Sequence, residues 1–276
     1  MISQESIKQY HGHSLSRGSN FLYVSPHFLL RPYIANYTVS FPTSETMPDD
    51  YTILPTASST LTFSVSSDRM ISGLRGVNTI PCKVGAAANK MKLLLLIEFH
   101  PGGLYPFIPV NHSELLDRSF KLNEINKKLG YVIEEELIRS DSIETLIAAL
   151  DRIFIKQLAG GTTSNDTSTM LRYIITQHGD INSRRLSDEF YYSEKHIRRL
   201  FLQYVGTSPK MFSRIVRTNY ALHLIQSHPC HLTGIAMQAG FFDQPHFIHD
   251  FKTVCGLTPQ EYIRNMSVFY NDQYKM

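Results

Sequence analysis

The side chains best suited to binding chemistry lie in the C-terminal half of the chain, where basic residues recur at short spacing. Lys195, Arg198 and Arg199 fall within a stretch whose apolar residues return every third or fourth position. Arg can bridge the O6 and N7 acceptors of guanine with two hydrogen bonds, and Lys neutralises phosphate. Between residues 184 and 217 the chain carries eight basic residues against three acidic ones, a local net charge of +5. This pattern indicates a surface that binds a polyanion.

The chain as a whole has the composition of a globular protein. Its 276 residues suffice for two domains, and 42% hydrophobic against 18% charged residues is too apolar for a disordered chain. The longest apolar run, 93–97, is far shorter than the roughly 20 residues of a membrane span, and the N-terminus lacks the pattern of a secretory signal. Cys82, Cys230 and Cys255 are odd in number and widely spaced, which predicts reduced thiols. We therefore expect a cytoplasmic protein with no membrane partner.

The two halves of the chain differ in their sequence patterns, strand-like in the first half and helical in the second, which predicts an α+β protein with two domains. Short β-branched or aromatic runs at 33–41, 53–54, 60–65 and 91–99 predict a small antiparallel sheet or barrel. The apolar residues of 143–158 follow helical spacing, and helices are expected to flank the sheet. We expect a β-rich regulatory, sensor or dimerisation domain at 1–158, a linker at 159–167, a helical domain at 168–266 and a tail at 267–276.

The helical domain contains an internal repeat with an offset of 50 residues. The repeat matches helix caps, aromatic residues, glycines and prolines: Ser193 with Asp243, Phe201 with Phe251, Gly206 with Gly256 and Pro209 with Pro259. Each unit thus supplies an N-cap, a glycine stop, and a second N-cap with proline in the first helical position. Thr258 and Glu261 add a capping box in the second unit.

Each cap is preceded by another short helical segment, 183–190 or 233–239, and a tight turn. Helix, turn and helix in this order form a helix-turn-helix, whose second helix enters the major groove of DNA. A helical projection of the second helix in the first unit gives two sides. One side is apolar and carries Ile197, Leu200, Phe201 and Tyr204. The other is mostly basic and carries Lys195, Arg198, Arg199 and Leu202. A lone charged face is usually only solvated, but the duplicated context favours DNA binding. A linking helix at 209–226 would be about 27 Å long, compatible with placing two such helices near one turn of DNA apart.

These segments carry a family resemblance. Residues 240–264 (GFFDQPHFIHDFKTVCGLTPQEYIR) resemble the signature of AraC/XylS-type transcription regulators, and 186–212 resemble their first helix-turn-helix. The resemblance implies a seven-helix, all-α DNA-binding domain and double-stranded DNA as the partner. It also implies the positions that face DNA: Lys195, Arg198 and Arg199 in the first unit, and Gln244, Pro245, His246 and His249 in the second. Lys252 is added as a phosphate contact, and Asp250 is expected to repel phosphate.

The N-terminal half resembles, through 30–33, 53–55 and 99–103, a poorly characterised β-rich domain that often precedes such DNA-binding domains. We expect this domain to take a small-molecule effector or a protein partner, and no ligand-binding residue can be identified. RNA polymerase is a further candidate partner. The apolar stripe of 143–158 could pack on a second copy as well as on the sheet, so a homodimer is a hypothesis, as is the alternative that the stripe only covers its own domain.

The cysteines leave one enzymatic alternative open, in which a reactive thiol carries out a reaction. Pro229, Cys230 and His231 resemble a motif of DNA alkyl-transfer regulators, and a neighbouring His can lower a thiol pKa. A DNA-repair alkyltransferase-type regulator would use Cys230 or Cys82, but a loop between the two repeat units is the favoured interpretation. His11 and His13 resemble the HxH of metal-binding cupin barrels without the expected Glu. We therefore expect no metal, no cofactor and no enzymatic reaction.

Overall fold

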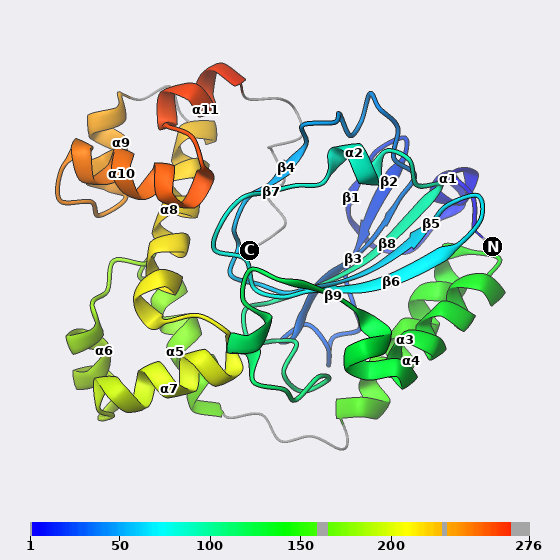
Figure 1. The fold of residues 1–276 in the computed structure, drawn as a ribbon, viewed down its shortest axis with the longest axis horizontal. Coiled ribbons are helices and arrows are strands. Elements are labelled where there is room, and N and C mark those ends of the chain that lie inside the picture. Colours follow the sequence, from blue (N-terminus) through cyan, green and yellow to red (C-terminus); the bar gives the residue numbers. More distant parts are fainter. Residues whose placement is uncertain (1, 159–164, 228–230, 266–276) are drawn as a thin grey trace.

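The computed structural model describes residues 2–158, 165–227 and 231–265. The first of these ranges contains an open, seven-stranded antiparallel sheet with the strand order β1-β2-β3-β8-β5-β6-β9 (Figure 1). Its strands are β1 (Ser14–Arg17), β2 (Phe21–Val24), β3 (Ile34–Ser40), β5 (Thr60–Val65), β6 (Met70–Arg75), β8 (Leu93–Phe99) and β9 (Ser119–Lys121). A small second sheet pairs β4 (Thr52–Ile53) with β7 (Cys82–Lys83). The expected N-terminal sheet is confirmed, in an open form with β1 and β9 at its edges.

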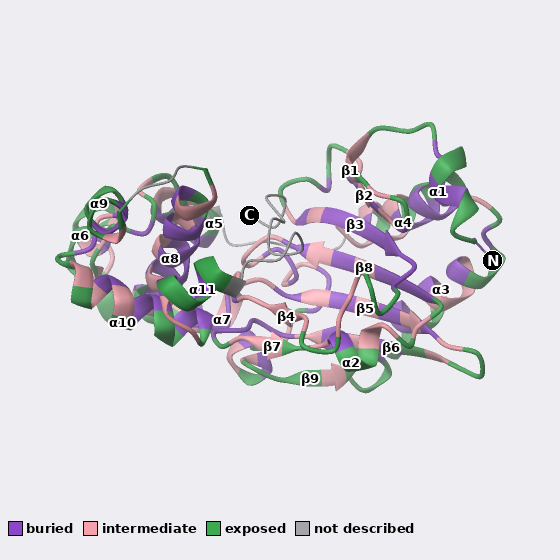
Figure 2. Cartoon of the chain, turned by 90° about the horizontal axis from the view of Figure 1, so that it is seen from above, coloured by how far each residue is buried: buried purple, intermediate pink, exposed green. Residues whose placement is uncertain are grey.

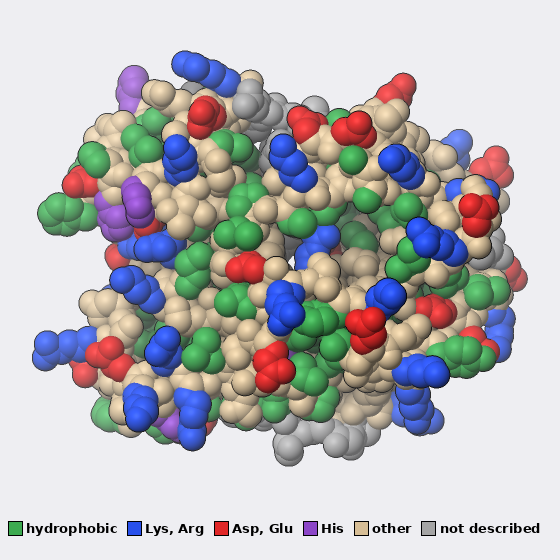
Figure 3. Space-filling model, viewed as in Figure 1, with side chains coloured by type: hydrophobic (Ala, Val, Ile, Leu, Met, Phe, Trp, Pro, Cys, Tyr) green, Lys and Arg blue, Asp and Glu red, His purple; other side chains and the backbone are tan. Residues whose placement is uncertain are grey.

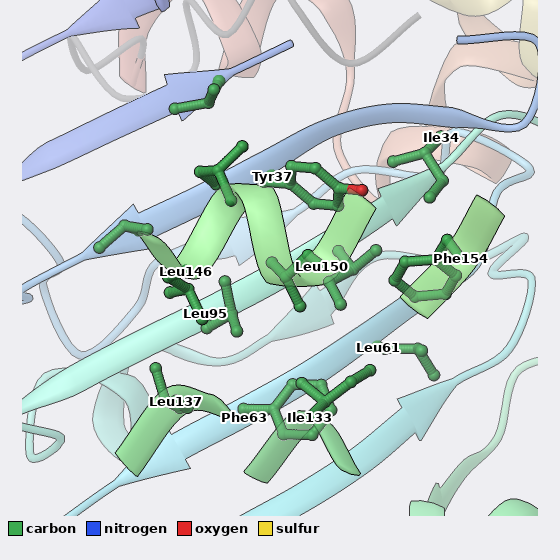
Figure 4. Close-up of a cluster of buried hydrophobic side chains, with 14 of the residues drawn as sticks. Ile34, Tyr37, Leu61, Phe63, Leu95, Ile133, Leu137, Leu146, Leu150 and Phe154 are labelled. Atoms are coloured by element: carbon green, nitrogen blue, oxygen red, sulfur yellow. The ribbon is translucent and has the colours of Figure 1, made fainter. Parts of the chain in front are cut away.

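Helices cover one face of the sheet and bury the larger hydrophobic core. α3 (Leu122–Arg139) and α4 (Ile143–Leu158) pack their apolar sides on the inward residues of the strands. Figure 4 shows Leu61, Phe63 and Leu95 of the sheet in one cluster with Ile133 of α3 and with Leu146 and Leu150 of α4, all of them fully buried. The short elements α1 (Glu5–Gln9), α2 (Gly85–Ala88) and the 3-10 helix η1 (His112–Leu115) complete this half.

The stripe of α4 that suggested a homodimer is used within its own domain. Ile143, Leu146, Leu150 and Phe154 are each 0% exposed and Ile147 is 8% exposed. A second copy therefore finds little apolar surface on this stripe, and the homodimer hypothesis gains no support from it. Within the described residues, no helix is long and apolar enough to cross a bilayer.

The remaining described residues form seven helices, as the family resemblance implied. They are α5 (Asn165–Thr176), α6 (Ser183–Phe190), α7 (Glu194–Tyr204), α8 (Pro209–Ser227), α9 (Leu232–Gln238), α10 (Gln244–Cys255) and α11 (Pro259–Asn265). α5 begins within the range expected as a linker. The long helix α8 connects the pair α6–α7 to the pair α9–α10 (Figure 1). Burial concentrates in the sheet and along α8, which is the centre of the second core (Figure 2).

Candidate nucleic-acid interface

The two helix-turn-helix units are built by the local signals found in the sequence. The Ser193 side chain accepts a hydrogen bond from the His196 amide at 3.2 Å and caps α7. The Asp243 side chain accepts one from the His246 amide at 2.7 Å and caps α10. In the expected capping box, the Thr258 amide donates to Glu261 at 2.7 Å, and the Glu261 amide donates to the Thr258 hydroxyl at 3.3 Å. These side chains satisfy helix amides that would otherwise lack acceptors, so they fix where each helix begins.

α7 has one packed face and one basic face. Ile197 and Phe201 are 2% and 0% exposed and belong to the second core. Lys195, Arg198 and Arg199 are all exposed on the opposite side. In Figure 3, Lys and Arg side chains gather at the lower left, over α6 and α7. The structure thus brings together the three basic residues singled out in the first unit, and it leaves their cationic groups accessible to a large polyanion.

α10 presents a less cationic outer face than α7. Pro245, His249 and Lys252 border a shallow depression together with Ile248 and Thr253, so much of the outer surface is apolar. The Gln244 side-chain oxygen accepts a hydrogen bond from the Thr233 hydroxyl at 2.7 Å, which occupies the acceptor that adenine recognition would use. The side chains of His249 and His246 are 75% and 39% exposed, and a ring nitrogen of each lies near the Asp250 carboxylate, at 3.5 and 3.4 Å.

The expectation that Asp250 repels phosphate was wrong. The Asp250 side chain is only 2% exposed and lies between two arginines of α8. Its carboxylate oxygens are 3.1 Å from Arg214 Nε and 3.6 Å from Arg217 Nη2. The buried carboxylate is therefore neutralised and ties α10 to α8. The same contacts withdraw Arg214 and Arg217 from the basic surface suggested by the local charge count.

The C-terminal end of α7 packs directly on the N-terminal domain. The Tyr204 ring meets the Tyr105 ring edge to face at 4.4 Å between centroids. Gly206 ends α7 with a φ of +91°, and a Cβ at this position would lie 2.8 Å from the His112 carbonyl oxygen. Glycine is required here both by the left-handed backbone and by the close approach. Farther along, Asn219 of α8 donates a buried 2.9 Å hydrogen bond to the Pro55 carbonyl.

His112 lies in this interface and is held neutral. Its ring is 1% exposed, and burial lowers the pKa of His112 to about 4, with hydrogen bonds to the Ile108 and Tyr204 backbone offsetting part of the effect. Nothing local in the sequence distinguishes this residue from the other histidines, so it could not be predicted as an interface residue. Its environment comes from chain segments about 90 residues apart.

The low pKa of His112 makes stability depend on pH. Since the unfolded chain binds the proton with an ordinary pKa near 6.5, stability is full above that pH and falls as the pH drops toward 4. Lowering the pH from 7.5 to 5 should cost about 2 kcal/mol at this one site. Urea unfolding of the wild type and of His112→Gln at both pH values measures it. An equal loss in the two proteins would contradict the assignment.

The second face of the sheet, away from α3 and α4, borders a cavity of about 470 Å³. Successive side chains of a strand point to opposite faces of the sheet. In β5 the apolar residues therefore face the helices, whereas Thr60, Thr62 and Ser64 line the cavity. Arg75 and Glu98 flank Thr60 on the neighbouring strands and also line it. The cover consists of residues from two segments, 46–58 and 78–88. Sequence analysis identified no ligand-binding residue, although the polar alternation of 60–65 was a usable signal.

The cysteine alternative gains no support from the structure. Cys82 is half-buried and lines the cavity beside Lys83. Cys255 is buried, and burial raises the pKa of its thiol, which disfavours the reactive thiolate. Pro229 and Cys230 lie outside the described residues. Among the described residues, no three His, Cys, Asp or Glu side chains come together in a way that could hold a metal ion. His11 and His13 therefore do not belong to such a group.

Comparisons with known proteins match both halves of the chain. A family model described as a helix-turn-helix domain matches residues 186–265, and one described as a domain of unknown function (DUF6597) matches residues 23–121. The uncharacterized HTH-type transcriptional regulator YidL of Escherichia coli (strain K12) is 25% identical over 178 residues, 61% of this chain and 59% of that protein. The HTH-type transcriptional activator RhaS of Escherichia coli O9:H4 (strain HS) is 25% identical over 156 residues, 55% of each.

Solved structures align as well. A probable AraC family transcriptional regulator from Rhodopseudomonas palustris CGA009 is 27% identical, with a TM-score of 0.33 over 37% of this chain and 96% of that one. The chain spans somewhat more than half the length of the two E. coli relatives, so what those whole proteins do does not transfer directly.

Proposed function

We propose that this chain binds specific sequences of double-stranded DNA through the major groove, on the premise that the helix-turn-helix domain matched at residues 186–265 is of the AraC type found in transcription regulators. Such binding takes place in the cytoplasm, where bacterial DNA lies. The observation that carries the proposal is α7, which buries Ile197 and Phe201 in the core and exposes Lys195, Arg198 and Arg199. Exposed arginines on a helix held rigidly from behind are suited to bidentate contacts with guanine.

The two helices contribute unequally in this proposal. α7 supplies most of the base discrimination, because its outer face carries two guanidinium groups. α10 acts chiefly by positioning, since Pro245 offers only apolar contact, the Gln244 oxygen is already engaged by Thr233, and Lys252 reaches phosphate. His246 and His249 are the remaining donors near the DNA.

A base-substitution scan tests the proposal. The duplex that the wild-type protein selects from a random pool is changed one base pair at a time, and each affinity is measured at a fixed salt concentration. Substitutions in the half contacted by α7 should each cost about 1–3 kcal/mol, and those in the half contacted by α10 distinctly less. If the α10 half tolerates changes no better than the α7 half, the unequal contribution is wrong. If no position matters, sequence-specific binding is wrong.

We also propose that the N-terminal domain controls DNA binding by taking a small polar effector into its cavity. A volume of about 470 Å³ falls in the usual range of ligand sites. The hydroxyls of Thr60 and Thr62 offer hydrogen bonds, and Phe21 and Tyr23 offer apolar contact. Asn78 is 7% exposed, and its amide nitrogen makes no hydrogen bond with the described residues. A buried donor without an acceptor favours a ligand that supplies one.

The cover of the cavity is also the surface that contacts the DNA-binding domain. Pro55 accepts the hydrogen bond from Asn219 of α8, and Ala57 and Val77 are fully buried in the second core. Pro81 lies against Gly256 at the end of α10. A ligand that shifts segments 52–58 or 77–83 would therefore act on α8 and α10 directly, which is the physical basis for control.

Coupling between two sites is reciprocal, so it can be tested with DNA in place of the effector. Adding the selected duplex should change hydrogen–deuterium exchange in 52–58 and 77–83. Helix α3, which packs on the face of the sheet opposite the cavity, serves as the internal control and should not respond. Protection of α7 with no response in either cover segment would argue against control through this route.

The remaining expectations stay predictions. Contact with RNA polymerase, a protein partner for the N-terminal domain and a homodimer are not tested by the contacts described above. We propose no enzymatic reaction for this chain.

A further inference from the structure

A groove of about 820 Å³ runs between α7 and the N-terminal domain. One wall is the outer face of α7, with Lys195, Arg198 and Arg199. The other wall is the segment 105–113, which contributes the polar residues Tyr105, Asn111 and Ser113 and the apolar residues Pro109 and Val110. The face proposed to enter the major groove therefore has a second protein surface beside it.

The two walls are held together by direct contacts. η1 packs against α7, and Gly206 at the end of α7 lies against the His112 carbonyl. Gln203 Nε2 is 3.5 Å from the Tyr105 hydroxyl, within the same groove. The wall is therefore fixed at a short distance from the basic face and accompanies it when α7 approaches DNA.

The dimensions of DNA determine what such a neighbour must meet. A helix with its side chains is about 10–12 Å across and fills a major groove about 12 Å wide. Any protein element next to that helix then faces one of the sugar–phosphate strands that border the groove. We propose that the segment 105–113 binds this strand, so that the N-terminal domain contributes directly to the DNA interface; the inference rests on the proposed role of α7.

The chemistry of the wall fits a phosphate backbone. Hydroxyl and amide groups such as those of Tyr105 and Asn111 are common donors to phosphate oxygens. The Asn111 side-chain oxygen already accepts from the Ser113 amide at 3.2 Å and from its hydroxyl at 2.9 Å, so its NH2 group carries the donors left to offer. The described residues that line the groove include no aspartate or glutamate. Glu114 is exposed beside the wall but does not line it.

Charge variants at the exposed Asn111 test the inference in the full chain. Asn111→Lys should tighten binding to the duplex selected by the wild type, by up to about eightfold at 0.1 M salt, the effect of releasing one more counterion. Its plot of log affinity against log salt should steepen by about 0.9. Asn111→Asp should weaken binding. The matched control is Asn123→Lys, an equal charge change at an exposed residue of α3 that does not line the groove.

The outcomes separate this inference from the proposed function. If both lysine variants behave alike while Arg198→Ala weakens binding, α7 contacts DNA and the wall does not, which overturns the inference. Tighter binding by Asn111→Lys with an unchanged salt slope also overturns it, since the wall would then only shield α7. If Arg198→Ala binds like the wild type, the proposed role of α7 itself fails.

Discussion

Replacing Phe251 with alanine should lower the free energy of unfolding by about 3–5 kcal/mol, the usual cost of deleting a buried phenylalanine. Phe251 is 0% exposed and packs edge to face against Phe247 and Tyr262, at 5.6 and 5.8 Å between ring centroids. Removing the ring leaves a cavity between α10 and α11 that the rigid α8 cannot close. Urea unfolding followed by circular dichroism measures the change.

The same helix-turn-helix unit offers a matched control. Phe242 is 92% exposed in the turn before α10, so Phe242→Ala should change stability by less than about 0.5 kcal/mol. Two phenylalanines nine residues apart thus differ in expected effect by nearly an order of magnitude. Similar unfolding curves for the two variants would show that the packing of α10 is not as described.

The double variant Arg198→Ala with Arg199→Ala should lose specific DNA binding while keeping its fold. Each arginine is expected to contribute about 1–3 kcal/mol, so the pair costs about 2–6 kcal/mol if the contacts are independent, at least roughly thirtyfold in affinity. Both side chains are exposed, and their removal leaves the core untouched. Titration on the selected duplex gives the affinity, and thermal unfolding checks the fold.

Arg152→Ala is the control for loss of positive charge. Arg152 is exposed on α4 of the N-terminal domain and lines neither the groove nor the cavity. Its removal should leave affinity nearly unchanged, because charges well beyond the Debye length of about 10 Å are screened. Wild-type affinity in the Arg198/Arg199 variant would remove the basic face of α7 from the account.

The helical domain was the part most readily predicted from sequence. Its helices begin at side-chain caps such as Ser193 and Asp243 and end at glycines such as Gly206, and these signals act over three or four residues. The burial of Phe201 and the exposure of Arg198 follow from the same helical period. Such features do not depend on distant parts of the chain, so periodicity and caps were sufficient.

What sequence reasoning missed depends on contacts between distant segments. β1, β2, β6, β7 and β9 were not predicted, because short strands take their stability from partners rather than from local pattern. Asp250 was misjudged because its environment is set by Arg214 and Arg217 on another helix. The cavity and the groove beside α7 each join segments far apart in the sequence, and no spacing rule connects Asn111 with Arg198.

The most direct test of the central claim is a hydroxyl-radical footprint of the full chain on the duplex it selects from a random pool. The account predicts strong enrichment of one sequence and two protected regions on one face of the DNA, centred about one helical turn apart, as two linked reading helices require. In a parallel footprint, the Arg198/Arg199 variant should lose the region contacted by α7. A pool without enrichment, or one uniform protected stretch that the variant leaves unchanged, would contradict the claim that this chain reads DNA with two helix-turn-helix units.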